Sequence, residues 1–228
     1  MSPKPAFLVS GTDTGVGKTR IACGLAAGFR ELGLCVGVMK PAETGCESVS
    51  GELIAADALA LRAAANTTDP LEMISPYRYA TPLAPAAAAE TEGREAPDMT
   101  QIRRCYEQLA AKNDVMLVEG AGGLAVPLTW SENYADLARA LDLDLILVVN
   151  NRLGCLNAAL LSLNYATGRG VRICGYILNN AAGENSPTVR TNAASLRRLT
   201  AIPCLGEIAH GAPVPLELCR RVLSLTQS

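Results

Sequence analysis

Residues 11–19 read Gly11-Thr12-Asp13-Thr14-Gly15-Val16-Gly17-Lys18-Thr19. They follow an apolar run at 6–10 that predicts a strand, and they open a segment at 19–32 in which small and apolar residues recur at helical spacing. This context is typical of a phosphate-binding loop, because glycines let backbone N–H groups converge and a helix N-terminus attracts anions. The usual pattern has four residues between its first glycine and Gly-Lys-Thr, whereas this loop has five. We predict that Lys18 reaches the β- and γ-phosphates and that Thr19 binds Mg²⁺; a glycine-rich turn with a chance lysine is the alternative.

Outward from this loop, short apolar segments alternate with longer segments of helical spacing. Strands are predicted at 34–39, 115–118, 145–149, 171–178 and 203–205, and helices at 54–65, 86–92, 99–112, 134–141, 155–167, 186–199 and 215–225. Strands without polar residues, separated by helices, are typical of a parallel sheet with both faces covered. With no internal repeat and no linker, the chain is predicted to be one α/β domain, residues 1–228, with a mostly parallel sheet of the P-loop NTPase kind and helices on both faces.

The composition excludes several classes of protein. Of 228 residues, 49% are hydrophobic and 18% charged, which is too apolar for a disordered chain. The 20 basic and 22 acidic residues leave a net charge of −2, which argues against a nucleic-acid or anionic-membrane partner. No apolar segment approaches the ~20 residues that span a bilayer. The eight cysteines form no Cys-x-x-Cys pair and no signal peptide is recognisable, so we expect reduced thiols and a cytoplasmic protein.

Polar residues fall where the predicted strands end, and in a parallel sheet these ends meet at one crevice. Glu119 follows a strand and precedes glycines, which favours a second Mg²⁺ ligand; a solvated loop glutamate is the alternative. Asp57, before an apolar helical pattern, is either a ligand or a surface residue. Lys40 ends a strand before Pro41, where it could stabilise a phosphoryl group in transfer or be an ordinary exposed lysine.

Together these residues resemble one family, the ATP-dependent dethiobiotin synthetases. Residues 11–19 are similar to its nucleotide loop, 40–45 to its Lys-Pro-x-x-[Ser/Thr]-Gly motif, and 118–123 to its Glu-Gly-Ala-Gly-Gly segment. Further similarities follow in order at 57–59, 126–128, 135–137, 153–157, Asn179 and 205–208. The resemblance covers essentially residues 5–210.

The resemblance implies a reaction that converts 7,8-diaminopelargonate, CO₂ and ATP into dethiobiotin, ADP and phosphate. One amine of the substrate is carbamated, the carbamate takes the γ-phosphoryl group, and the second amine closes the ureido ring. It also implies Mg²⁺ as cofactor, ATP as co-substrate and a homodimer. Preference among nucleoside triphosphates does not follow from these residues.

The resemblance also implies a role for each residue of the motifs. Thr14, Lys18 and Lys40 would contact the carbamate and γ-phosphate; Thr19, Asp57 and Glu119 would gather Mg²⁺; Thr44 would contact the substrate. The nucleotide would further lie against Gly15, Val16, Gly17, Arg20, Gly120, Ala121, Gly122, Asn179 and Asn180, with Asn179 and Pro203, Cys204 and Leu205 framing the base. The helix start at Gly154, Cys155, Leu156 and Asn157 would hold the substrate carboxylate across a dimer interface.

This sequence departs from the family pattern at a few positions. Ala84-Pro85-Ala86 stands where many members have Ser-Pro-His, and Gly15 stands where some have glutamate. The tail from His210 matches poorly, and we expect this single histidine to be a loop residue and not a catalytic base. None of these departures touches the predicted phosphate and metal ligands.

Two other functions are compatible with a phosphate loop. An amidoligase of corrinoid synthesis would carry a glutaminase domain with a catalytic Cys and His, for which this chain has no room. A partitioning-type ATPase switch would carry an extra lysine early in the loop, where Thr12 and Asp13 stand. No Asn-Lys-x-Asp element indicates guanine specificity.

Overall fold

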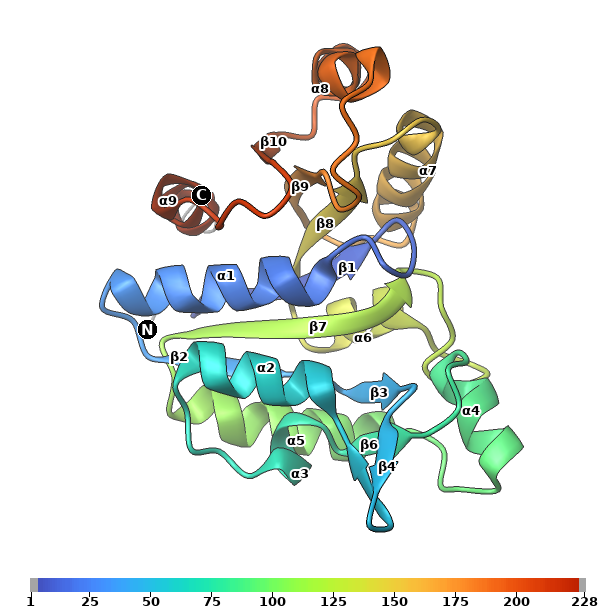
Figure 1. The fold of residues 1–228 in the computed structure, drawn as a ribbon. Helices are drawn as coiled ribbons and strands as arrows, with labels where there is room; N and C mark the ends of the chain where they lie inside the picture. The colour runs from blue at the N-terminus through green and yellow to red at the C-terminus, as the bar shows by residue number, and fades with distance from the viewer. Residues whose placement is uncertain (1–3, 226–228) are drawn as a thin grey trace.

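The computed structural model describes residues 4–225, which form an α/β fold around a six-stranded parallel sheet (Figure 1). The strands follow the spatial order β10-β9-β8-β1-β7-β2. Their bounds are β1 Ala6–Gly11, β2 Val36–Met39, β7 Val115–Gly123, β8 Asp144–Asn150, β9 Ile173–Asn179 and β10 Cys204–Ile208. Because every neighbouring pair is parallel, all six strands end at the same edge of the sheet.

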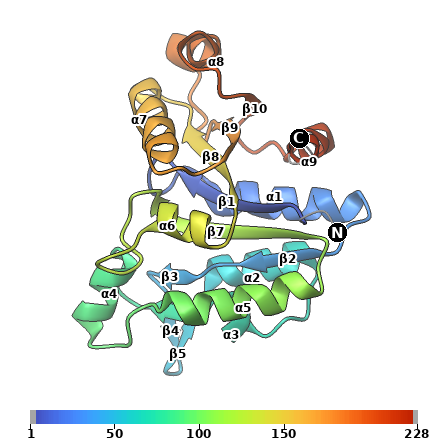
Figure 2. The same cartoon turned by 180° about the vertical axis from the view of Figure 1, so that it is seen from behind.

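Helices cover both faces of the sheet, as the two opposite views show (Figures 1 and 2). One face carries α1 Lys18–Glu31, α2 Ala56–Ala65 and α9 Leu216–Ser224; the other carries α5 Met99–Ala111, α6 Tyr134–Ala140, α7 Cys155–Gly168 and α8 Pro187–Leu199. The side chains of β1 alternate between these layers: Phe7 and Val9 pack with α1, while Leu8 packs on the opposite side. The predicted fold class is thus confirmed.

Between β2 and β7 the structure contains short elements that hydrophobic periodicity does not predict. They are β3 Ala42–Thr44, β4 Glu47–Val49, β5 Glu52–Ile54, α3 Leu71–Ile74 and β6 Tyr77–Tyr79, followed by the predicted short helix, α4 Pro85–Glu92. β3 pairs with β6 in parallel, and β4 and β5 form a hairpin. Each of these strands has three residues and includes polar ones, so no alternating pattern is visible in the sequence.

Two strands continue further than their apolar runs suggest. β7 does not break at Glu119 but continues to Gly123, which pairs with Gly11 of β1. β10 continues past Leu205 to Ile208, which pairs with Asn179 of β9. Backbone pairing with a neighbouring strand extends each of them through glycines and acidic residues that end the apolar pattern.

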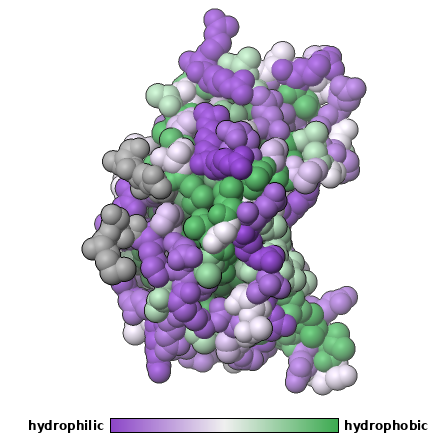
Figure 3. All heavy atoms as spheres, turned by 90° about the vertical axis from the view of Figure 1, so that its left-hand side faces the viewer, coloured by the Kyte–Doolittle hydropathy of each residue, from purple (hydrophilic) through white to green (hydrophobic). Residues whose placement is uncertain are grey.

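All eight cysteines lie in the described part of the chain and are free thiols, as predicted, and six of them are buried. Within residues 4–225, no helix combines the length and apolar character needed to cross a bilayer. The face at the edge where the strands begin has hydrophobic residues at its centre and polar ones around them (Figure 3). Most of the predicted site residues lie elsewhere, at or after the ends of the strands; Pro203–Leu205, at the start of β10, are an exception.

Candidate active site

The loop after β1 has the geometry of a phosphate-binding loop. Gly17 precedes the first residue of α1 with a φ of 93°, a conformation that favours glycine, and a Cβ there would lie 2.3 Å from Nδ2 of Asn179. A Cβ on Gly11 would lie 2.6 Å from a methyl carbon of Val16. Lys18 is buried, and its ammonium donates to the carbonyl oxygen of Asp13 at 3.0 Å. The loop therefore folds back around Lys18 in the way an anion site requires.

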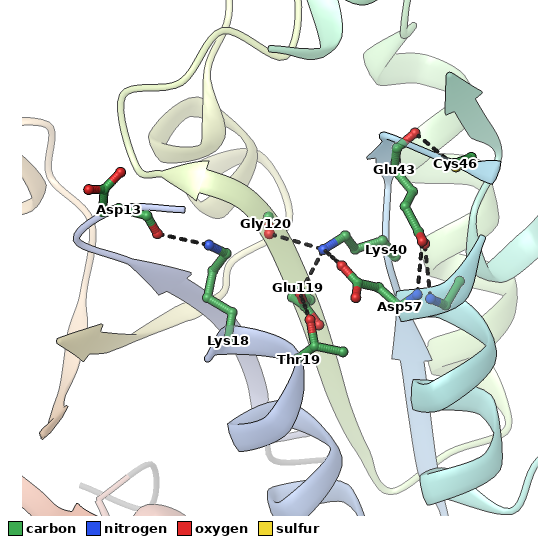
Figure 4. Close-up of polar contacts among 10 residues, drawn as sticks. Asp13, Lys18, Thr19, Lys40, Glu43, Cys46, Asp57, Glu119 and Gly120 are labelled. Carbon is green, nitrogen blue, oxygen red and sulfur yellow. Dashed lines mark hydrogen bonds and ion pairs between the residues drawn. The ribbon is translucent and has the colours of Figure 1, made fainter. Parts of the chain in front are cut away.

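Lys40 and two carboxylates form a charged cluster beside this loop (Figure 4). The Lys40 ammonium lies 2.7 Å from Asp57 Oδ2 and 2.6 Å from Glu119 Oε1. The Thr19 hydroxyl donates to the same Glu119 oxygen at 2.8 Å. The side chains of Lys40 and Glu119 are 4% and 1% exposed, so salt screens their attraction very little. The interpretations of Glu119 as a solvated loop residue and of Lys40 as an ordinary exposed lysine are therefore wrong.

This cluster sets the protonation of its members. Burial lowers the pKa of Lys40, but Glu119 and Asp57 raise it, and the net pKa lies above the ordinary lysine value. Burial raises the pKa of Asp57, whereas the charge and hydrogen bond of Lys40 lower it, and the net shift is downward. For Lys18, burial and then repulsion from Lys40 lower the pKa. Lys40 is thus a permanent cation and not a general base at neutral pH.

The carboxylates and the Thr19 hydroxyl fit a hard cation such as Mg²⁺. Glu119 Oε2 is buried and has no hydrogen-bond partner among the described residues, and a buried carboxylate oxygen without a partner is costly. Within residues 4–225, no three or more His, Cys, Asp or Glu side chains are grouped so that they could hold a metal ion by themselves. A cation here would therefore need further ligands from outside the protein. Two carboxylates with a hydroxyl, completed by water and phosphate oxygens, are the set that Mg²⁺ takes beside nucleotides.

Glu43, which the sequence presents only as one position of a motif, makes contacts that spacing does not reveal. Its carboxylate accepts hydrogen bonds from the backbone N–H groups of Asp57 at 2.8 Å and Ala58 at 3.0 Å. Burial raises the pKa of Glu43, and these hydrogen bonds oppose the shift. Glu43 thus connects β3 to the start of α2, where Asp57 lies.

A cavity of about 660 Å³ brings most of the predicted residues together. Its walls are Thr14, Gly15, Gly17, Lys18, Thr19, Lys40, Glu43, Thr44, Asp57, Pro82, Leu83, Ala84, Glu119, Ala121, Gly122 and Val126. The predicted catalytic residues and metal ligands therefore share one space with Thr44, although they come from four separate parts of the chain. Ala84, where many family members have serine, is one of its walls.

Asn179 lies at the end of β9, but Pro203–Leu205 do not lie beside it. Cys204 pairs with Tyr176, three residues before Asn179, because Pro203–Leu205 precede or begin β10. Ile208 pairs with Asn179 instead, and its carbonyl accepts from Asn180 N at 2.9 Å. The structure thus places residues 208–210 where the sequence placed 203–205, and exposed His210 lies in the loop after β10 as predicted.

The side chains of Asn179, Asn180 and Arg20 have protein partners. Asn179 Nδ2 donates to Val16 O at 2.7 Å, and its Oδ1 accepts from Arg20 at 3.1 Å. Arg20 also donates to the carbonyl of Ala212. Asn180 exchanges two hydrogen bonds with the backbone of Glu184. Arg20 and Asn179 therefore connect the phosphate loop to the loop after β10.

The start of α7 is not part of the large cavity within one chain. Gly154 and Cys155 line a separate cavity of about 120 Å³ with Asp13 and Val16 of the phosphate loop. Arg152, just before them, forms an ion pair with Asp13 at 3.7 Å. Thr44 and the helix start at 154–157 are thus separated in the single chain.

Comparison with known proteins decides the family. A protein-family model described as an AAA domain matches residues 5–214. The ATP-dependent dethiobiotin synthetase BioD of Anaeromyxobacter dehalogenans (strain 2CP-C) is 47% identical over 194 residues, 85% of either chain, and that of Anaeromyxobacter sp. (strain K) is 42% identical, covering 96% of this chain and 94% of the relative. The chain belongs to the ATP-dependent dethiobiotin synthetase family. The resemblance seen in the sequence is confirmed, and with it the enzyme class, an ATP-dependent ligase of biotin biosynthesis.

Solved structures outside the dethiobiotin synthetases share the fold. The cell division ATPase MinD of Pyrococcus furiosus has a TM-score of 0.57 at 16% identity and covers 98% of this chain and all of its own. A ParA family ATPase from Chlorobium tepidum TLS has a TM-score of 0.55 at 16% identity and covers 99% of both chains. At such low identity these likenesses show the common P-loop NTPase fold alone.

Proposed function

We propose that this protein closes the ureido ring of dethiobiotin from 7,8-diaminopelargonate, CO₂ and ATP, through a carbamate and a carbamic–phosphoric anhydride. The observation that carries the proposal is the Lys40 ammonium, held between Asp57 and Glu119 at the wall of a cavity that also contains Lys18 and Thr44. Two cations beside a phosphate loop suit a step in which negative charge builds up on a transferring phosphoryl group.

Thr19, Asp57 and Glu119 would hold Mg²⁺, which would neutralise phosphate charge when bound. Lys18 and the loop N–H groups would hold the phosphates, and Thr14 would contact the γ-phosphate and the carbamate. Lys40, permanently charged, would stabilise the phosphoryl group during transfer. Gly15, Gly17, Ala121 and Gly122 line the cavity without bulk, so they leave room for the nucleotide.

The base of ATP would lie near Asn179, with residues 208–210 in place of Pro203–Leu205. Support comes from two contacts of Asn179. It donates a hydrogen bond to Val16 of the phosphate loop, and it pairs with Ile208, so the end of β10 also lies near this loop. Arg20 would act by holding Asn179 and the Ala212 carbonyl in position.

The substrate would bind between Thr44 and the helix start at Gly154–Asn157 of a second copy, so we propose a homodimer. The separation of these two regions within one chain supports a contribution from a second copy. Exposed Leu153, just before α7, and exposed Leu161, on α7, supply apolar area for such a contact. We further propose that residues 1–228 act as one domain and that it works in the cytoplasm, which suits eight free thiols.

Phosphate release from ATP tests the proposal. We expect release only when diaminopelargonate and bicarbonate are both present, together with a product that has the mass of dethiobiotin. Rapid hydrolysis without the diamine, or a diamine whose mass does not change, would contradict the assignment. Leaving out Mg²⁺ should abolish release.

A further inference from the structure

Glu43 is a buried carboxylate that faces a helix end instead of water. Its residue is 5% exposed, on β3, and its two oxygens accept from the N–H groups of Asp57 and Ala58 at 2.8 and 3.0 Å (Figure 4). A buried carboxylate is retained only where its oxygens find partners, and here each oxygen has a backbone donor.

Glu43 supplies the first N–H groups of helix α2 with hydrogen-bond acceptors that the N-cap residue of the helix does not supply. The first N–H groups of a helix have no partner within it, and a Ser, Thr, Asp or Asn at the N-cap usually accepts from them. The N-cap of α2 is Ala55, which makes no side-chain hydrogen bond. Glu43, twelve residues earlier in the chain, fills this role from a neighbouring strand.

The capped residue is the one that binds Lys40. Asp57 has its N–H held by Glu43 while its carboxylate lies 2.7 Å from the Lys40 ammonium. Glu43 and Lys40 belong to one short segment, fixed by the pairing of β3 with β6 and by the bond from Lys40 N to Ile74 O at 2.7 Å. The segment at residues 40–44 thus carries the Lys40 cation and, through Glu43, also holds the backbone of Asp57, which contacts that cation.

We propose that Glu43 is a positioning residue for Mg²⁺, acting through Asp57: it fixes the Asp57 backbone so that the carboxylate stays beside the Lys40 ammonium, which Glu119 also contacts. The inference rests on the proposed function, because it takes Asp57 as a Mg²⁺ ligand. Side chains that hold metal ligands in place typically contribute 10–100-fold to metal affinity. A simple helix cap would contribute to stability alone.

Two substitutions of Glu43 test the role. Glu43→Ala removes both acceptors. Glu43→Gln keeps the volume and one acceptor but turns an NH₂ group toward the other helix N–H, so it is the milder change. The control, Glu47→Gln, removes an exposed carboxylate from nearby β4. Asp57→Asn is assayed in parallel, because it tests the metal site itself.

The readout is Mn²⁺ binding, followed by electron paramagnetic resonance in protein saturated with β,γ-imido-ATP, with the Mg²⁺ dependence of turnover beside it. We expect Glu43→Ala to weaken Mn²⁺ binding about tenfold and Glu43→Gln by less. The Mg²⁺ concentration for half-maximal turnover should rise in step, more than kcat falls. Glu47→Gln should match the wild type.

The outcomes separate the two levels of the proposal. If Asp57→Asn weakens Mn²⁺ binding while both Glu43 variants bind it as the wild type does, Glu43 only caps the helix and the inference is overturned. Loss of thermal stability with unchanged Mn²⁺ affinity overturns it equally. If Asp57→Asn also leaves Mn²⁺ affinity unchanged, the proposed metal site is wrong and the inference with it. Should Glu43→Ala not fold, Glu43→Gln decides alone.

Discussion

The phosphate loop and the segment at residues 40–44 each bring one buried lysine to the cavity, in opposite electrostatic surroundings. Lys18 donates to a neutral carbonyl and is repelled by Lys40, and its pKa is lowered by burial and by that repulsion. Lys40 contacts two carboxylates, which raise its pKa although burial alone would lower it. Among residues 4–225, Lys18 has no carboxylate within ion-pair distance, whereas Lys40 has two. We expect bound phosphate to supply the counter-ion of Lys18.

The two regions also differ in whether backbone conformation or side-chain contacts determine their shape. The phosphate loop is shaped by backbone: Gly17 takes a positive φ, and Asn179 fills the space that a side chain would need. The other side is shaped by side chains, with Glu43 holding Asp57 and Asp57 holding Lys40. We therefore expect Lys18 to act mainly in binding ATP and Lys40 mainly in the transfer step.

Lys40→Met should have the largest effect on turnover. Methionine retains the apolar stem and removes the ammonium, and loss of one donor aimed at developing charge typically costs ~10²–10³ in rate, or roughly 2.7–4 kcal/mol. ATP affinity should stay within a few-fold of wild type, because the interaction belongs to the transition state. Steady-state rates and nucleotide titrations measure both quantities.

A matched control is Lys112→Met, which removes a half-exposed lysine paired with Asp69, away from the cavity. It should leave turnover unchanged. If Lys40→Met keeps more than about a tenth of wild-type turnover, well short of the expected loss, Lys40 has no catalytic role.

Lys18→Met should affect ATP binding as well as turnover. Lys18 would hold phosphate in the ground state, and a hydrogen bond to a charged group contributes about 1.5–3 kcal/mol, or roughly 10–100-fold in affinity. Titration with ATP in the absence of diamine isolates this effect. Equal ATP affinity in the wild type and in Lys18→Met would remove the contrast between the two lysines.

How much the sequence predicts follows from how local each feature is. The phosphate loop is predicted residue by residue because strand, glycines, lysine and helix are contiguous at 6–32. Lys40 and Glu119 are found because strands of a parallel sheet end together, but their 2.6 Å contact joins residues 79 positions apart. Glu43 as the cap of α2 is a tertiary contact, and no local pattern signals it.

The error at the end of β10 has a physical cause. The apolar run ends at Leu205, so the strand is predicted to stop there, and the base-framing residues are placed at 203–205. Gly206 and Glu207 nevertheless continue the strand, because pairing with β9 extends through Ile208. The residues predicted to frame the base, Pro203–Leu205, therefore lie near the start of the strand and not at its end beside Asn179.

The smallest expected effect concerns stability without ligand, where the two lysines should act with opposite sign. The pKa of Lys18 is lower in the folded protein than in the unfolded chain, so its charge is a penalty that is fully present below the folded-state pKa. The penalty disappears as pH rises toward the ordinary lysine value of about 10.4. The pKa of Lys40 is raised, so its contribution is favourable below about pH 10.4 and is lost only as pH rises through the folded-state pKa.

Lys18→Met should therefore stabilise the ligand-free protein at pH 7, whereas Lys40→Met should destabilise it because Asp57 and buried Glu119 lose their counter-ion. Denaturant unfolding at pH 7, 9 and 10 measures both differences from the wild type, in which the titration of all other groups cancels. Over this range the Lys18 difference should shrink as pH approaches about 10.4, where it ends, while the Lys40 difference should stay nearly constant. A Lys18→Met protein less stable than the wild type at pH 7 would show that the Lys18 ammonium already has enough partners within the ligand-free protein. The two lysines would then differ in their catalytic roles, but each positive charge would stabilise the folded protein.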